Sequence, residues 1–173
     1  AALLPHPPDG GAASASELAD GEAYDGPLSS YFSEANAMLT MQHLSEGIGY
    51  RVVGTQKHVD AEVWLEDVLR RYEGTHATGG SEYATHVEVF RQQSDGRHRF
   101  EILGHPVWKR YYGMSNLIVR VSDGSEESKA HTLLVNAHID STIPSPGAVD
   151  DAAGVAIMLE ALRALTVRGA PRA

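Results

Sequence analysis

The chain has 173 residues, no cysteine and a formal net charge of −9 at pH 7. This length suits one ordinary domain or part of a larger one, and the acidic balance, without a basic stripe, excludes nucleic acid as a partner. Because disulfides and thiolate ligands are excluded as well, any metal ion must bind to imidazole and carboxylate groups. No apolar run approaches the roughly 18 to 20 residues of a membrane span.

The first part of the chain is predicted to contain a lead-in and two helices. Residues 1–27 are rich in Ala, Gly, Pro, Ser and acidic residues, and we expect them to form a flexible lead-in because they offer little apolar surface to bury. A helical pattern starts at Phe32, with Ser33 as its N-cap, and ends at the glycines of "GIG" (47–49). A second helix is predicted in "HVDAEVWLEDVLRRYEG" (58–74), whose apolar residues recur at helical spacing.

Four strands are predicted next. "THVEVFRQ" (85–92) alternates with period two, "SDGR" (94–97) is a turn signal and "HRFEIL" (98–103) is a second strand, so the pattern predicts a hairpin. "NLIVRV" (116–121) and "TLLVNA" (132–137) are two further strands. The last one is apolar on both faces, which is typical of a strand buried inside a sheet that is covered by helices.

The final element is a helix with a continuous apolar stripe. Its apolar residues fall at helical spacing: Val155, Met158, Leu159, Leu162 and Leu165. Arg168, Gly169 and Pro171 then end the helix in the expected order. Taken together, the elements predict an α/β fold with a mixed β-sheet flanked by helices.

Three histidines are followed by an acidic residue two positions later, a pattern expected about once by chance in a chain of this composition. The triplets "HVD" at His58 and "HVE" at His86 are interpreted as an exposed helix face and a strand face. The third, "HID" at His138, differs in its position. It lies at the end of the predicted buried strand, where ligand-binding groups of open α/β sheets gather.

Asp150 and Asp151 follow the proline-containing loop "STIPSPG" (141–147) and open the final helix. An aspartate at a helix start is a favoured cap and stabilises the helix by about 0.5–2 kcal/mol. One aspartate suffices for that role, and the small residues of "GAVDDAAG" let the backbone come close, so one carboxylate is available for a metal ion. A carboxylate can bind two ions about 3.5–4 Å apart, and imidazole suits zinc. The residues alone leave the cap and the metal interpretations open.

The stretch "AHIDSTIPSPGAVDDAAGVAIMLEALRAL" (137–165) resembles the signature of the co-catalytic zinc aminopeptidases, family 28 of the metallopeptidases. The likeness extends upstream through both predicted helices and the strand "SNLIVRV" (115–121), and it covers roughly residues 28–166. It is strongest to the endoplasmic reticulum metallopeptidase branch and the related fungal vacuolar membrane proteases. The resemblance implies a zinc-exopeptidase-like α/β/α sandwich, of which residues 28–173 would form the amino-terminal part.

The resemblance also implies a role for each site residue. His138 resembles the ligand of one zinc ion, and Asp150 resembles the carboxylate that bridges two zinc ions. Asp140 resembles the catalytic-site residue that orients His138, while Asp151 would support the bridge or cap the helix. The implied cofactor is therefore a pair of zinc ions, and the implied substrates are peptides that are shortened from their amino terminus.

The family's remaining site residues, a Glu-Glu pair, an Asp and a His, have no counterpart after Asp151, where Glu160 is the only acidic residue. We therefore expect a truncated chain with the first half of the two-metal site and no activity by itself. The start at an alanine and the end just after a helix favour the same interpretation. In the complete protein, the resemblance implies membrane anchoring through segments absent here, at the endoplasmic reticulum or vacuolar membrane, with a lumenal peptidase domain.

Two alternatives stay open. The dinuclear amidohydrolases of the carboxypeptidase kind also use H-x-D, but the turn that follows it in that family differs from "GAVDDAAG". A non-catalytic binding or assembly module, similar to nicastrin or the transferrin receptor, would keep the fold and lose the ions. The joint presence of His138, Asp140 and Asp150 favours the peptidase.

Overall fold

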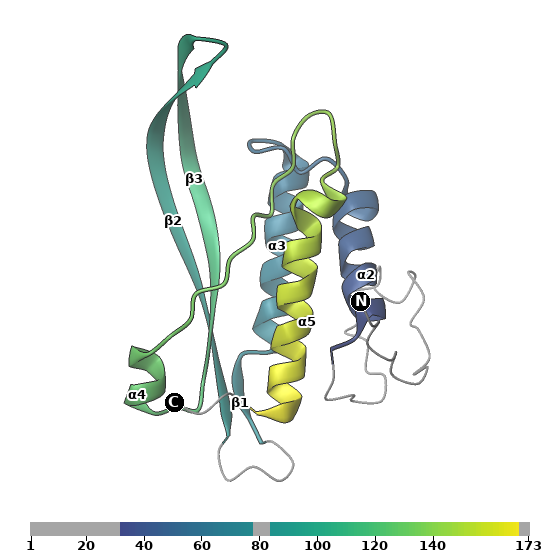
Figure 1. The fold of residues 1–173 in the computed structure, drawn as a ribbon, viewed down its shortest axis with the longest axis vertical. Helices are drawn as coiled ribbons and strands as arrows, with labels where there is room; N and C mark the ends of the chain where they lie inside the picture. Colours follow the sequence, from purple (N-terminus) through teal and green to yellow (C-terminus); the bar gives the residue numbers. More distant parts are fainter. Residues whose placement is uncertain (1–31, 78–83, 170–173) are drawn as a thin grey trace, which may run out of the picture.

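The computed structural model describes residues 32–77 and 84–169. The predicted lead-in at 1–27 lies outside the described residues. In the described part, a long antiparallel hairpin lies beside a group of helices (Figure 1). No described helix has the length and apolar character needed to cross a membrane.

Both helices predicted in the first part of the chain are confirmed. Helix α2 (Glu34–Gln42) begins after Ser33, whose hydroxyl accepts the Asn36 N–H as an N-cap, and the chain continues in a π-helical segment, η1 (His43–Ile48). Gly49, with φ of 89°, ends that segment at a conformation that only glycine adopts easily. Helix α3 (Gln56–Arg71) begins after Thr55, whose hydroxyl accepts the His58 N–H.

The sheet has three strands in the order β1 (Gly74–His76), β2 (Thr85–Ile102) and β3 (His105–Ser122), all antiparallel. The predicted hairpin turn at 94–97 is wrong. The strand continues through this stretch with one irregularity, because the Asp95 carboxylate accepts the Gly113 N–H at 2.7 Å and so bridges the two strands. The Asp-Gly signal is therefore used for a bulge within a long strand.

The predicted buried strand at 132–137 is also wrong for the described structure. After helix α4 (Glu126–Ala130) this segment runs without strand pairing, and the exposed fractions of Leu133 and Leu134 are 86% and 82%. Apolar residues on both faces indicate that a segment requires burial. They do not supply the neighbouring strands, and no described strand pairs with it.

The last helix is confirmed. The segment η2 (Ala148–Ala152) leads into α5 (Ala153–Arg168), which ends at Gly169 with φ of 107°. The α/β class is confirmed too, because helices flank a β-sheet. The strand pairs within the described residues are all antiparallel, so the parallel part of the predicted mixed sheet does not occur there.

Two small cores join the helices to one another and to the sheet. One is built around Leu44, Ala61, Ala152 and Val155, which bring η1, α3 and the start of α5 together. The other joins Leu69 of α3 and Leu162 of α5 to the strand residues Val87 and Val89. The first core lies directly beneath the loop that carries the predicted metal ligands, because Ala137 and Ile139 pack against it.

Replacing Leu44 with alanine tests whether this first core supports the fold. Leu44 is fully buried, so Leu44→Ala should lower the free energy of unfolding by about 2–5 kcal/mol through lost burial and the cavity that remains. Urea denaturation followed by circular dichroism measures the change. The matched control is Leu134→Ala, since this exposed leucine should leave stability within about 0.5 kcal/mol. Equal losses in both variants would contradict the assignment of the core.

Candidate functional site

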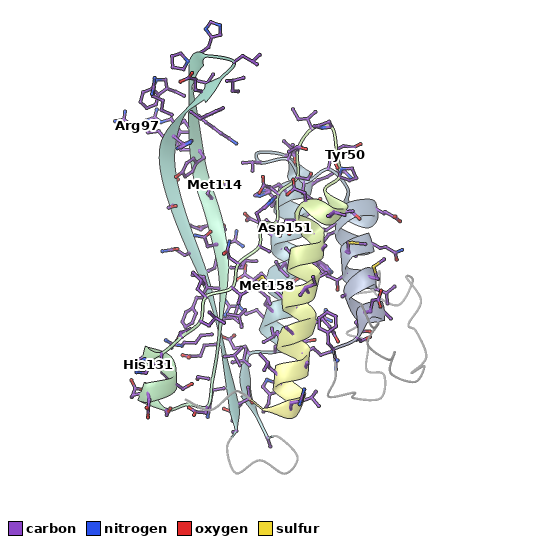
Figure 2. The ribbon with its side chains drawn as sticks, viewed as in Figure 1. Tyr50, Arg97, Met114, His131, Asp151 and Met158 are labelled. Carbon is purple, nitrogen blue, oxygen red and sulfur yellow. The ribbon has the colours of Figure 1, made fainter. Side chains whose placement is uncertain are left out.

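The predicted site lies in the connection between the unpaired segment 132–137 and α5. The chain passes His138 and Asp140, crosses the loop at 141–147 and returns through η2 to the start of α5, where Asp151 lies (Figure 2). The loop is held at one side by Ser141, which donates its N–H to the Arg51 carbonyl oxygen and accepts the Arg51 N–H at 2.9 Å. His138 and Asp150, which are 12 positions apart in the sequence, are thereby brought into contact.

His138 and Asp150 meet directly. The His138 Nε2 atom lies 2.9 Å from Oδ1 of Asp150. The other ring nitrogen, Nδ1, lies 3.1 Å from the backbone carbonyl oxygen of Asp140 and 3.2 Å from its carboxylate oxygen. Both side chains remain open to solvent, with exposed fractions of 51% for His138 and 81% for Asp150.

The surroundings favour the protonated form of the His138 ring. Burial lowers the pKa of His138, but the hydrogen bond to Asp150 and the negative charges of Asp140 and Asp151 outweigh it. The pKa of this imidazole is therefore raised above its ordinary value. Because a carboxylate and a carbonyl oxygen can only accept, both ring nitrogens act as donors in this arrangement.

Asp151 faces the same histidine from the backbone side. Its Oδ2 atom accepts the His138 N–H at 3.2 Å. A Cβ atom at residue 154 would collide with the Asp151 carboxylate, which explains the glycine of the "DDAAG" sequence. Neither aspartate caps the helix, since the N-cap of α5 is Ala152 and no side chain hydrogen-bonds there. Both carboxylates point toward His138 instead.

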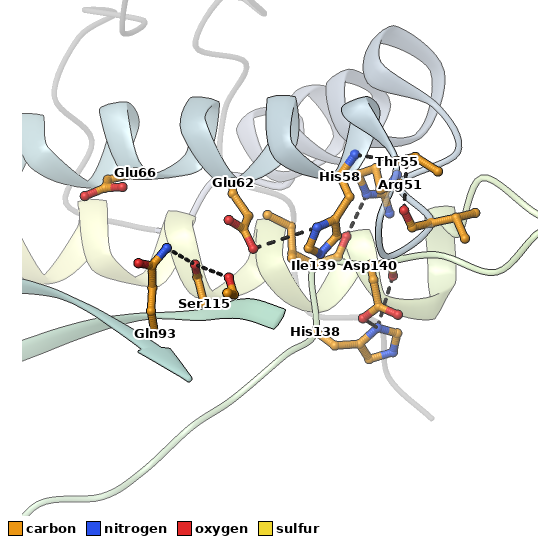
Figure 3. A network of polar contacts seen from close by, with 12 residues as sticks. Arg51, Thr55, His58, Glu62, Glu66, Gln93, Ser115, His138, Ile139 and Asp140 are labelled. Carbon is orange, nitrogen blue, oxygen red and sulfur yellow. Dashed lines mark hydrogen bonds and ion pairs between the residues drawn. The ribbon is translucent and has the colours of Figure 1, made fainter. Parts of the chain in front are cut away.

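Arg51 is the residue of this region that sequence analysis missed. It lies in the segment before α3, its side chain is completely buried, and it hydrogen-bonds to backbone carbonyls only (Figure 3). Its guanidinium donates to the carbonyl oxygens of Leu44, Gly49, Ile139, Pro146 and Gly147 at 2.6–3.2 Å. Burial lowers the pKa of Arg51, and the charge of Asp140 partly offsets this. The only hint in the sequence is a single cation between two glycine-containing turns.

The histidines of the other two "H-x-acid" triplets contact residues of the helices and strands and lie outside the candidate site. His58 is buried rather than exposed, contrary to expectation, and its Nδ1 atom lies 3.8 Å from the buried Glu62 carboxylate. Glu62 in turn forms a 2.7 Å ion pair with Arg91 of β2. Figure 3 shows this polar network along α3, separate from His138. His86, on β2, lies 3.1 Å from the Thr75 hydroxyl of β1.

Glu160, the acidic residue that follows the pair in the sequence, is also engaged. It is buried, forms a 2.7 Å ion pair with Arg163, and accepts the Ser33 N–H at the start of α2 at 2.7 Å. A carboxylate at this place satisfies the open amide groups of a helix start. Glu160 therefore ties α5 to α2 and does not approach His138.

The donor set at His138 fits zinc, and it is incomplete. Two ligands on one tetrahedral zinc lie about 3.3 Å apart when their bonds are about 2.0–2.1 Å long, and Nε2 of His138 and Oδ1 of Asp150 are 2.9 Å apart. An imidazole and a carboxylate on an open surface are suitable ligands. Within residues 32–77 and 84–169, no group of three or more potential ligands is arranged to bind a metal ion, so His138 and Asp150 are two candidate ligands, fewer than the three or four of a zinc site.

Comparisons with known proteins point in the same direction. The sequence profile of Peptidase family M28 matches residues 116–172, which include the complete loop with His138 and both aspartates. The chain is 40% identical over 150 residues to an endoplasmic reticulum metallopeptidase 1 of Schizosaccharomyces pombe, covering 87% of this chain and 18% of that protein. The chain belongs to peptidase family M28.

Two further relatives of this M28 chain have related names. Leucine aminopeptidase 1 of Penicillium rubens is 26% identical over 80% of this chain and 31% of its own length. Vacuolar membrane protease of Yarrowia lipolytica is 27% identical over 77% of this chain and 11% of its own length. The chain thus spans less than a third of each of these relatives. No solved structure matches it.

Replacing Arg51 with methionine tests its role in holding the loop. The variant keeps apolar bulk but removes the guanidinium donors from five backbone carbonyl oxygens, two of which also accept a backbone N–H. Arg51→Met should therefore lower the free energy of unfolding by about 3 kcal/mol or more, as measured by urea denaturation. Hydrogen exchange of the amides at 139–147 should also accelerate. Arg120→Met, which removes a surface arginine paired with Glu88, serves as the control and should leave exchange in this loop unchanged.

Proposed function

We propose that the protein is a zinc-dependent metallopeptidase of the aminopeptidase type and that residues 28–173 form the amino-terminal part of its peptidase domain. The observation that carries the proposal is the 2.9 Å approach of His138 Nε2 to Asp150 Oδ1 on an open surface, in a loop that belongs to family M28. The substrates are peptides, from which amino-terminal residues are removed.

His138 and Asp150 are the ligands that this chain contributes. His138 would hold one zinc ion, and Asp150 would be the carboxylate shared by two. The exposure of Asp150 supports this role, since a bridging carboxylate needs access on both of its oxygens. Its backbone supports the role as well, because the non-helical φ of −115° and ψ of 89° at Asp150 turn it out of the helical path.

Asp140 fixes the histidine for this task. Its carbonyl and carboxylate oxygens both lie within 3.2 Å of Nδ1 of His138, so the proton stays on Nδ1, and a zinc ion would replace the proton that Nε2 shares with Asp150. Asp151 complements this arrangement from the other side through the His138 N–H. Asp140 therefore orients the imidazole, and Asp151 holds the backbone of the same residue, before any ion binds.

Bound zinc supplies a polarised water at neutral pH and a Lewis acid for the peptide carbonyl. The residues of this chain orient the ligands and hold the loop in place. A general base that takes the proton from water is required as well. Glu160, which is buried against Arg163, cannot take that role, so the base and the remaining ligands come from other residues of the complete protein.

The complete protein is placed at the endoplasmic reticulum or vacuolar membrane, with the peptidase domain on the lumenal side and anchoring segments outside this chain. The names of two relatives, an endoplasmic reticulum metallopeptidase and a vacuolar membrane protease, support this placement. A non-catalytic binding or assembly module is the competing outcome that the following experiments address.

Asparagine substitutions in the complete protein separate a bridging ligand from an orienting residue. Asp150→Asn removes the negative charge that offsets two cations and replaces one ligating oxygen with an NH₂ group, so zinc affinity and peptidase rate should fall by more than about 100-fold. Asp140→Asn should cost about 10–100-fold, the range typical of residues that orient a ligand. Zinc content by metal analysis and the rate on amino-acid amide substrates measure both effects.

Asp60→Asn is the matched control, because Asp60 belongs to another "H-x-D" triplet and its carboxylate accepts a hydrogen bond only from Gln56 of the same helix. This variant should keep full zinc content and rate. If Asp150→Asn behaves like Asp60→Asn, the bridging role is wrong. A complete protein that binds no zinc and hydrolyses no peptide would favour the non-catalytic module.

The purified 173-residue chain should show no peptidase activity when zinc is added. Two ligands without a free base cannot assemble the hydrolytic site. The measurement is amino-acid amide hydrolysis before and after repurification, with and without a chelator. Turnover that persists through repurification and disappears with the chelator would show that the chain carries a complete site.

A further inference from the structure

The outer end of the β2–β3 hairpin has no role in the proposed peptidase. We call residues 97–112 the hairpin tip. It extends beyond the ends of α2, α3 and α5 (Figure 1), and Arg97 lies on it well away from the helices (Figure 2). The strands are fully paired along it, from Arg97 opposite Arg110 to Ile102 opposite His105. The hairpin tip is therefore an ordered projection from the body.

The turn of the hairpin tip presents an apolar side chain. Leu103 and Gly104 form the two-residue turn with φ of 50° and 78°, and positive φ at both positions is typical of a type I′ turn, which favours Asn-Gly. A leucine at the first position is strained, and its side chain is 93% exposed. Ile102 beside it is about half exposed. Neither the turn geometry nor packing within the described structure accounts for this leucine.

Cations of the hairpin tip lack carboxylate partners. Arg97, Arg99, Lys109 and Arg110 lie on it, and none of them forms an ion pair within the described residues, whereas Arg70, Arg91 and Arg120 of the body each bind a glutamate. Arg97 and Arg110 are direct cross-strand neighbours. Like charges at opposed positions destabilise a hairpin, and an anionic surface would relieve this repulsion.

Two exposed aromatic rings lie among these cations. Trp108 is 64% exposed and Tyr112 is 69% exposed. The guanidinium of Arg97 lies 6.0 Å from the Trp108 ring centroid, and that of Arg110 lies 5.6 Å from the Tyr112 ring centroid. Trp108, Arg110 and Tyr112 alternate along β3 and so share one face of the hairpin. Apolar turn, aromatic rings and cations thus follow one another along the hairpin tip.

We propose that the hairpin tip docks onto the surface of an anionic lipid bilayer. Leu103 and Ile102 enter the boundary of the acyl chains, Trp108 and Tyr112 lie at the level of the headgroups, and the four cations bind lipid phosphate and carboxylate groups. Trp and Tyr are the residues enriched at this depth because each combines an apolar ring with a polar group.

The charge distribution favours an anionic bilayer, rather than a second copy of the chain, as the partner of the hairpin tip. The hairpin tip carries four Lys and Arg residues and one acidic residue, Glu101, in a chain whose net charge is −9. An anionic bilayer therefore attracts the hairpin tip and repels the rest of the chain, which orients the molecule with its tip toward the lipid. A flat lipid surface also accommodates an apolar side chain at the outermost point of a projection without requiring a matching pocket.

Vesicle binding by the purified 173-residue chain tests the proposal. The probes are two kinds of vesicle: phosphatidylcholine alone, and phosphatidylcholine in which phosphatidylserine makes up about one third of the lipid. We expect binding only with phosphatidylserine and a decrease as salt is raised. In a Trp64→Phe background Trp108 is the remaining tryptophan, and its fluorescence should shift to the blue on binding and be quenched by brominated acyl chains.

Two variants remove the lipid contacts without weakening the hairpin. Leu103→Asn places the preferred residue at the turn and removes the apolar group. Arg97→Gln combined with Arg110→Gln removes the cross-strand repulsion together with two charges. Each should weaken binding by about 10-fold or more. The matched control is Leu134→Asn, which removes another largely exposed leucine, from the unpaired segment, and should leave binding unchanged.

The outcomes separate the possible occupants. Binding that is the same without phosphatidylserine, or that is lost in Leu134→Asn and kept in Leu103→Asn, would overturn the proposal and assign the effect to general hydrophobic adhesion. A dimer that forms without vesicles and is lost in Leu103→Asn, with no vesicle binding, would identify a second copy as the occupant. A Trp108 emission that does not change on addition of anionic vesicles would also overturn it.

Discussion

The guanidinium of Arg51 joins two segments that are about 90 residues apart in the chain. On one side it binds the carbonyl groups at Leu44 and Gly49, where the π-helical end of the first helix turns. On the other side it binds Ile139, Pro146 and Gly147, which enclose the loop of the candidate site. A buried arginine without a carboxylate partner is costly unless its donors are satisfied. Here they are satisfied by five backbone carbonyl oxygens, of which those of Leu44 and Gly147 also accept a backbone N–H.

The position of the candidate metal ligands depends on this arrangement because the loop has little regular structure of its own. The segment before His138 is unpaired, and the residues between Ser141 and Gly147 belong to no helix or strand. Arg51 and Ser141 fix the first side of the loop, and the packing of Ala152 and Val155 fixes the second. His138 and Asp150 are then directed toward each other at the surface, and the three aspartates around the imidazole determine its protonation and its direction.

The described molecule divides its charges into two regions with different roles. In the body, arginines are matched to glutamates across elements, as with Arg91 to Glu62 and Glu66, and these pairs join α3 to the sheet. At the hairpin tip, cations and aromatic rings are left toward solvent. The candidate site and the hairpin tip are thus independent in their chemistry, and a change in one need not alter the other.

The sequence by itself determined the helices, the family and the residues of the candidate site. Ser33, Gly49 and Gly169 mark helix ends through local backbone chemistry, and the order of His138, Asp150 and Asp151 along the chain is a local motif that requires no fold to recognise. Such features depend on residues within a few positions of each other, and for this reason they can be read from the chain directly.

Only the tertiary structure decided the features that depend on distant partners. The Asp-Gly pair at 95–96 signalled a turn, but the carboxylate of Asp95 accepts the Gly113 N–H and the strand continues to Ile102. His58 looked like part of an exposed face and proved to be buried against Glu62. Asp150 and Asp151 were equally suited to cap a helix, and the fold turned both toward His138. Arg51 gave no local signal, because several of the carbonyl groups that it binds belong to residues nearly 100 positions away. A sequence pattern does not show which distant carbonyl groups require a donor.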